Sequence, residues 1–146
     1  MTQKIEPVYV SFEQSKLLKE KGFKHYCPIS YWEGELTNRT PGYELENGET
    51  SQENYYDFPR YYAPEQWQVV EWLKVNYGIW VYTYSVAPFI ADNEDYPKIV
   101  WVSKVQKFEQ FDKFIEADNG LAINHHRSPQ EAYSAAFDYI LNNDLI

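Results

Sequence analysis

The stretch from residue 63 to residue 84 constrains the fold most, because it has the pattern of a helix that leads directly into a strand. Pro64 suits the first turn of a helix, where its missing N–H removes no hydrogen bond. Gly78 suits the position after the last helical residue, since glycine adopts a positive φ without a Cβ clash. We therefore expect a helix that ends at Tyr77 and a strand that begins at residue 79.

The apolar residues of this helix cover an arc of roughly 220° at 100° per residue, which predicts contacts on more than one side. They are Trp67, Val69, Val70, Trp72, Leu73 and Tyr77. Residues 79–84 are β-branched or aromatic throughout, a composition typical of a strand packed on both faces. We expect this strand to be central in its sheet.

Capping patterns predict two further helices. Ser11 and Gln14 form the pattern of a capping box, which predicts a short helix over residues 12–21. Near the C-terminus, Ser128 is followed by proline and, three residues after the serine, by Glu131, and this pattern predicts a helix that runs to about residue 142. Its alanines would let this helix lie close against one face of a sheet.

Three more segments have strand-like composition. In residues 26–32, Pro28 predicts an edge strand, and Glu33-Gly34 could begin a turn after it. Residues 98–105 would pair with 79–84 as an antiparallel hairpin, because a link of about twelve residues suits a hairpin better than a parallel crossover. For residues 108–116, one to two helical turns and a third strand both remain open.

These elements predict an α+β fold, with a small antiparallel sheet of three to four strands packed by three main helices. The length of 146 residues suits a single domain, 1–146. Residues 38–62 follow no period and are rich in Gly, Pro, Asn and Glu, which predicts a long aromatic and acidic loop whose C-terminal part folds back on the domain.

The aromatic residues on or beside this loop are the candidate interaction surface. They are Tyr31, Trp32, Tyr55, Tyr56, Tyr61 and Tyr62. Tyr and Trp combine a large contact area with a polar tip and are enriched at protein interfaces. Packing of the loop onto its own domain and stacking on sugars are the alternatives.

The formal net charge of −9 disfavours binding to a nucleic-acid backbone. No apolar run reaches 18 residues, and the N-terminus lacks the apolar segment of a signal peptide, so we expect a cytoplasmic protein that does not bind membranes. Cys27 is the single cysteine, and we expect it to be a buried thiol. Ordinary solubility explains the acidity as well as any specific role does.

No sequence motif indicates catalysis, a metal or a cofactor. His125 and His126 are adjacent, but no third metal ligand stands at a recognisable spacing. The acidic run 92–95 lacks the glycine and the ligand alternation of a calcium loop. Carboxylates that could form an acid–base pair are Glu33, Glu35, Asp57, or Asp92 with Asp95. We expect a non-enzymatic protein without catalytic residues, metal or cofactor.

Three segments together resemble an uncharacterised family of small proteins from bacteriophages and mobile elements of gut bacteria. They are residues 11–23, residues 63–81 and residues 128–137. The matched positions are helix caps and core residues, and no activity of the family can be transferred. The resemblance implies a phage or prophage origin.

The sequence therefore favours a small non-catalytic interaction protein that binds a protein partner or itself. Two alternatives stay open. The acidic surface could imitate nucleic-acid phosphates and occupy a DNA-binding host enzyme, or paired carboxylates in an aromatic cleft could act on or bind a carbohydrate.

Overall fold

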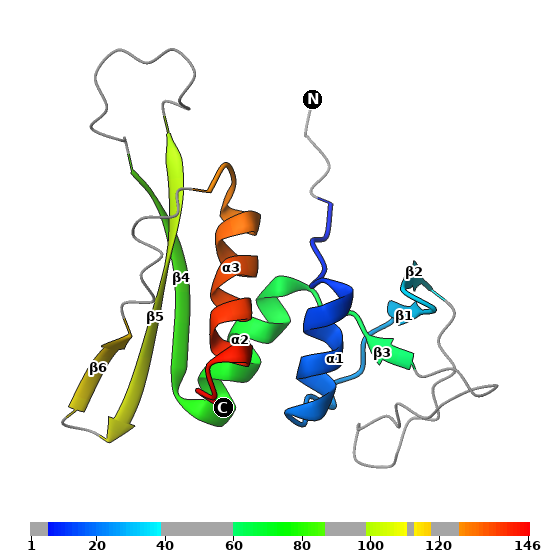
Figure 1. Ribbon diagram of the computed structural model, residues 1–146, viewed down its shortest axis with the longest axis horizontal. Helices are drawn as coiled ribbons and strands as arrows, with labels where there is room; N and C mark the ends of the chain where they lie inside the picture. Colours follow the sequence, from blue (N-terminus) through cyan, green and yellow to red (C-terminus); the bar gives the residue numbers. More distant parts are fainter. Residues whose placement is uncertain (1–5, 39–59, 87–98, 111–112, 118–125) are drawn as a thin grey trace. The chain divides into compact units, whose positions relative to one another are not determined.

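The computed structural model describes residues 6–38, 60–86, 99–110, 113–117 and 126–146 (Figure 1). The chain divides into two compact units, Met1–Val69 and Val70–Ile146. The boundary falls inside helix α2, Gln66–Tyr77. The arrangement of the whole chain as one domain stays a prediction.

Unit 1 combines helix α1, Phe12–Glu20, with a small antiparallel sheet in the order β2-β1-β3. The strands are β1, Ser30–Trp32, β2, Glu35–Thr37, and β3, Arg60–Tyr62. Strand β3 lies at the end of the predicted loop 38–62, so the expectation that this end folds back is confirmed by its pairing with β1.

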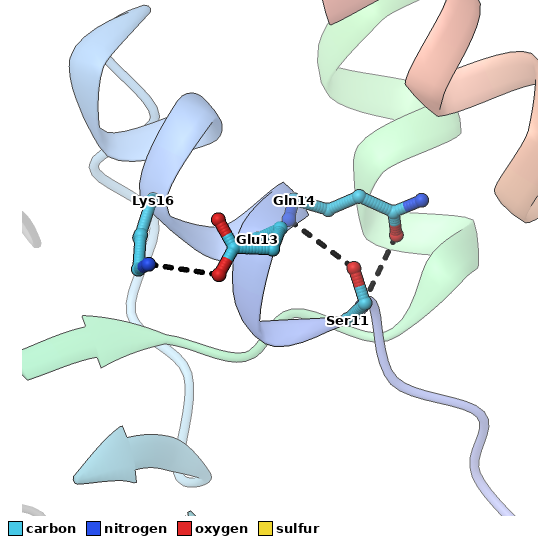
Figure 2. A network of polar contacts seen from close by, with 4 residues as sticks. All are labelled: Ser11, Glu13, Gln14 and Lys16. Atoms are coloured by element: carbon cyan, nitrogen blue, oxygen red, sulfur yellow. Dashed lines mark hydrogen bonds and ion pairs between the residues drawn. The ribbon is translucent and has the colours of Figure 1, made fainter. Parts of the chain in front are cut away.

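The capping box predicted for α1 is present (Figure 2). The backbone N–H of Gln14 donates to Ser11 Oγ at 3.2 Å, and the N–H of Ser11 donates to Gln14 Oε1 at 3.1 Å. Beside the box, Lys16 and Glu13 form an ion pair at 2.8 Å on the exposed side of the helix. Two N–H groups that a helix N-terminus leaves without partners are thus satisfied locally.

The expectation that residues 26–32 form an edge strand is wrong. Strand β1 is the central strand, with β2 on one side and β3 on the other. Pro28 precedes the first residue of β1 by two positions, so its missing N–H removes no bond from the ladder. Glu33 and Gly34 form the two-residue turn into β2, and their φ values of 50° and 84° are those of a type I′ turn.

Helix α2 begins two residues later than Pro64 suggests. The N–H of Val10 donates to the Pro64 carbonyl at 3.1 Å, so Pro64 belongs to an extended pairing rather than to the helix. Glu65 then takes the capping position, because its N–H donates to Gln68 Oε1 at 2.8 Å and its carbonyl accepts from the N–H of Gln68 at 2.9 Å.

Unit 2 contains an antiparallel sheet in the order β4-β5-β6. Its strands are β4, Ile79–Val86, β5, Val100–Gln110, and β6, Lys113–Ala117. The predicted hairpin is confirmed, with an unbroken register from Ile79 opposite Lys107 to Val86 opposite Val100. Residues 108–110 are the end of β5 and residues 113–116 form most of β6, so the strand alternative holds for the described part of this segment.

Helix α3, Pro129–Asn142, lies across β4 and β5 (Figure 1). Its predicted N-cap is present, because Ser128 Oγ accepts from the N–H of Glu131 at 3.2 Å, whereas Glu131 Oε2 accepts from the N–H of Arg127 rather than from Ser128. The buried side of the helix consists of Ala132, Ala136, Phe137, Ile140 and Leu141. Buried residues of the sheet include Ile79, Val81, Ser103 and Val105. The described chain thus holds three helices and two three-stranded sheets, an α+β fold with one sheet more than expected.

Strand β4 departs from its prediction as a central strand packed on both faces. It stands at the edge of the sheet, and β5 is central. Its burial alternates, with Ile79 and Val81 buried and Trp80, Tyr82 and Tyr84 exposed. Because successive side chains of a strand point to opposite faces, one face of β4 is in the core and the other carries its exposed aromatic side chains.

Candidate functional site

Two members of the predicted interaction surface lie in the core of unit 1. Tyr31 is only 8% exposed, and Tyr62 is 6% exposed. The Tyr31 hydroxyl donates to the Val10 carbonyl at 2.7 Å, and its ring lies 5.4 Å from that of Phe12. Burial raises the pKa of Tyr31, and burial, with charges at Cys27 and Tyr26, raises the pKa of Tyr62 to about 12. These two rings therefore stabilise the fold of unit 1.

The other described members of this surface are half-buried. The Tyr61 ring lies 5.7 Å from Phe12, and Lys19 Nζ lies 5.0 Å from the Tyr61 ring centroid. Trp32 is next to Tyr31 on β1, where it pairs with β2 and β3. Pairing of β1 with β3 brings Tyr31 and Tyr61 together around Phe12, as expected if the end of the loop packs onto its own domain. Tyr55 and Tyr56 lie outside the described residues.

A different group of aromatic side chains is exposed together in unit 2. We call it the aromatic face, and it consists of Trp80, Tyr82 and Tyr84 of β4 and Phe108 of β5. Their exposed fractions are 45%, 39%, 42% and 46%, so much of each ring is open to contact. The three β4 residues alternate along one strand and so project from the same side of the sheet.

The rings of the aromatic face contact one another in two pairs. Trp80 and Phe108 meet edge to face, with centroids 6.1 Å apart and planes at 74°. Tyr82 and Tyr84 lie 6.3 Å apart and are tilted by 36°. Such contacts hold large side chains in defined positions, which lowers the entropy that a partner would have to remove on binding.

Lys74 marks one end of the aromatic face. Its Nζ lies 4.5 Å from the Trp80 ring centroid, within range of a cation–π contact, and 3.6 Å from a carboxylate oxygen of Glu71. One side of the Trp80 ring is therefore already in contact with this lysine. Tyr82 and Tyr84 lie farther along β4, and Phe108 contacts Trp80 from β5.

The sequence did carry a signal for this face. In residues 79–83 aromatic residues alternate with Ile, Val and Thr, and a period of two is typical of a strand with one buried side. The uniformly apolar composition obscured that period, because a large ring fits either a core or an interface.

The candidate chemical groups do not form a reactive site in the described part of the chain. Cys27 is buried, and burial, reinforced by the charge of Glu65, raises the pKa of its thiol to about 12. A thiol with so high a pKa is a poor nucleophile near neutral pH. Glu33 and Glu35 are exposed on and beside the β1–β2 turn. Asp57, Asp92 and Asp95 lie outside the described residues.

His126 takes part in the backbone hydrogen bonding of unit 2. It exchanges two hydrogen bonds with Trp101, one at 2.8 Å and one at 2.9 Å, while His125 lies outside the described residues. No group of three His, Cys, Asp or Glu side chains among the residues described could hold a metal ion. Within the same residues, no helix has both the length and the apolar character needed to cross a membrane.

Comparison with protein-family models, with curated proteins and with solved structures finds no match to this chain. The resemblance to small phage proteins therefore stays a prediction. A functional assignment has to rest on the geometry of the chain itself.

Proposed function

We propose that this protein is a non-catalytic interaction protein, and that its contact surface is the aromatic face of unit 2. The observation that carries the proposal is the grouping of Trp80, Tyr82, Tyr84 and Phe108, all large and all exposed, on one sheet. Tyr and Trp are the residues most enriched among those that dominate binding energy at protein interfaces. The mechanism is surface complementarity with a protein partner or a second copy of the chain.

Burial of the four rings supplies part of the free energy of binding, and additional contacts are needed for a stable complex. Aromatic side chains bury about 150–250 Å² each, so covering the exposed parts of four rings removes roughly 300 Å² of apolar surface. At about 25 cal/mol per Å² this is worth about 7 kcal/mol, against about 4–15 kcal/mol for the lost freedom of two molecules. The rings supply much of the gain, and hydrogen bonds or rim contacts must supply the rest.

Capture of partners from a lysate of the source cell tests the proposal. The wild type is compared with the double variant Tyr82→Ala/Tyr84→Ala, which removes two exposed rings and leaves the buried side of β4 unchanged. The matched control is Trp67→Ala, since Trp67 is also exposed, at 61%, but lies on α2 and contacts Glu65 through its indole N–H. All three proteins should have the same circular dichroism spectrum.

The expected result is a partner, another protein or tagged copies of the chain itself, that wild type and Trp67→Ala both retain and that the double variant loses. Equal recovery of every partner by the double variant would overturn the proposal. Loss of partners from Trp67→Ala alone would also overturn it, because the contact surface would then lie on α2.

A further inference from the structure

The outer edge of β4 presents a row of backbone groups that face away from β5. The N–H of Phe108 donates to the Gly78 carbonyl at 3.1 Å, so residue 78 faces β5. The backbone N–H and C=O of Trp101 both bond to His126, on the side of β5 away from β4, so Trp101 makes no backbone hydrogen bond to its partner Ser85. In an antiparallel strand, successive residues direct their backbone N–H and C=O groups alternately to one side and to the other. The outward-facing residues of β4 are therefore Ile79, Val81, Thr83 and Ser85.

This edge lacks the features that normally prevent strand addition. Edge strands are usually protected by short length, a bulge, proline or charged residues. Strand β4 has eight residues, none of them charged and none proline, and its register with β5 is unbroken. At the opposite edge, β6 has five residues and adjoins an irregularity between Phe108 and Gln110. In the described residues no strand pairs with the outer edge of β4.

We propose that β4 pairs with β4 of a second copy of this chain, antiparallel and around a two-fold axis at Tyr82, to form one continuous six-stranded sheet. The inference rests on the proposed function, since the aromatic face would supply the side-chain contacts. Charge permits a second copy at this edge. A strand with charges of one sign sets like charges opposite each other when it meets its own copy, whereas β4 has no charged residue and does not, although the whole chain has a net charge of −9.

The sequence of β4 is self-complementary about Tyr82, as a two-fold interface requires. Aromatic rings at 80, 82 and 84 are symmetric about this residue, and so are the β-branched residues Val81 and Thr83. With Tyr82 opposite its own copy, Trp80 stands opposite Tyr84 of the second copy, so each of the three β4 rings faces a ring. The outward-facing Val81 and Thr83 become the hydrogen-bonded pair. Aromatic cross-strand pairs are among the favourable ones in sheets.

Cross-linking by single cysteines tests this register. In the variant Tyr82→Cys the two introduced cysteines would be directly opposite, with Cα atoms about 4.5 Å apart, within the range that a disulfide spans. In Tyr84→Cys the two would be four residues apart along the strands, about 14 Å, and too far to bond. The variants are matched, because each removes one ring of similar exposure. Cys27 can remain, since it is buried.

Under mild oxidation we expect Tyr82→Cys to give a covalent dimer and Tyr84→Cys to stay monomeric on a denaturing gel. Equal cross-linking of both variants, or of Tyr84→Cys alone, would overturn the proposed register. Failure of both to cross-link would count against it as well, provided that sedimentation shows the wild type to be dimeric. A wild type that sediments as a monomer at every concentration overturns the dimer itself.

A backbone variant separates this inference from the proposed function. Thr83→Pro removes an outward N–H and leaves the β4–β5 ladder intact, so it should abolish the dimer while preserving the circular dichroism spectrum. Ser85→Pro, at an exposed outward-facing position, serves if Thr83→Pro does not fold. A dimer unaffected by either proline overturns edge pairing.

The two proposals can fail separately. If the wild type is monomeric but loses a captured partner on Tyr82→Ala/Tyr84→Ala, only the self-pairing is wrong. If the proline variants abolish the dimer but the double alanine variant changes neither the dimer nor any partner, edge pairing stands and the proposed role of the aromatic face is wrong.

Discussion

Gly78 and Phe108 are joined where helix α2 turns into strand β4. The Gly78 carbonyl accepts a hydrogen bond from the N–H of Phe108 at 3.1 Å, and a Cβ built on Gly78 would lie 3.3 Å from the Phe108 carbonyl oxygen. Gly78 has a φ of 64°, in the left-handed region. The change from helix to strand within one residue thus depends on both the conformation and the small size of glycine.

The variant Gly78→Ala should lower the free energy of unfolding of unit 2 by about 1–2 kcal/mol, the usual cost of a left-handed alanine, and by more if the Phe108 backbone cannot move. Urea unfolding followed by circular dichroism measures the change. Gly78→Asn is the control, because asparagine tolerates this conformation but also has a Cβ. A smaller loss for Asn than for Ala is expected, and equal losses would mean that the contact, not φ, dominates.

The helices could be predicted because their boundary signals are local. Ser11 and Ser128 accept hydrogen bonds from N–H groups three residues ahead, and neither bond depends on the rest of the fold. Sheet order depends on distant segments. Neither Pro28 nor the composition of β4 indicates which strands pair on either side. The sequence therefore predicts an edge strand for residues 26–32 and a central strand for residues 79–84, whereas β1 is central in its sheet and β4 lies at the edge of the other.

The exposure of single aromatic side chains could not be predicted from the sequence for a similar reason. Tyr31 and Tyr82 both occupy strands among other aromatic residues, yet one is 8% exposed and the other 39%. What distinguishes them is the packing of each sheet face. Helix α1 and Phe12 are near Tyr31, whereas Tyr82 projects from the open face of β4. A ring has no sequence mark that separates these two environments.

The hydrogen bond from the Tyr31 hydroxyl to the Val10 carbonyl should contribute measurably to the stability of unit 1. Tyr31→Phe keeps the ring contact with Phe12 but leaves the buried carbonyl without this donor. We expect the free energy of unfolding to fall by about 1–2 kcal/mol. Tyr61→Phe is the matched control on the paired position of β3, where the side chain is half-buried, and it should change stability by less. Equal effects would contradict the structural role given to Tyr31.

The N-cap of α3 gives a prediction for unit 2. Ser128→Ala removes the acceptor for the Glu131 N–H and should destabilise unit 2 by about 1 kcal/mol, as measured by thermal or urea unfolding. Ser128→Asp keeps an acceptor and adds a negative charge at the positive end of the helix, so it should retain the stability. A loss as large for Asp as for Ala would mean that the loss does not come from the missing acceptor at the cap.

Unit 1 should become less stable as the solution becomes alkaline. Burial is the main reason that the pKa of Cys27 rises from 9.0 to about 12 and that of Tyr62 from 10.0 to about 12, so both groups are held neutral in the folded chain. In the unfolded chain the thiol ionises near pH 9 and the phenol near pH 10. The unfolded state therefore binds fewer protons in this window, and the contribution of both groups, fully present below pH 9, is lost as the pH rises toward 12.

For one such group the free energy of unfolding falls by up to about 1.4 kcal/mol per pH unit once the unfolded chain has lost its proton. Urea unfolding at intervals between pH 8 and pH 11 measures the slope. Cys27→Ala removes the first of these titrations, so its stability should stay level to about pH 10 and then fall with Tyr62 and with Tyr31, whose pKa burial also raises, although the lost packing lowers it at every pH. An identical pH profile for wild type and Cys27→Ala would show that the thiol ionises as readily in the folded chain as in the unfolded one.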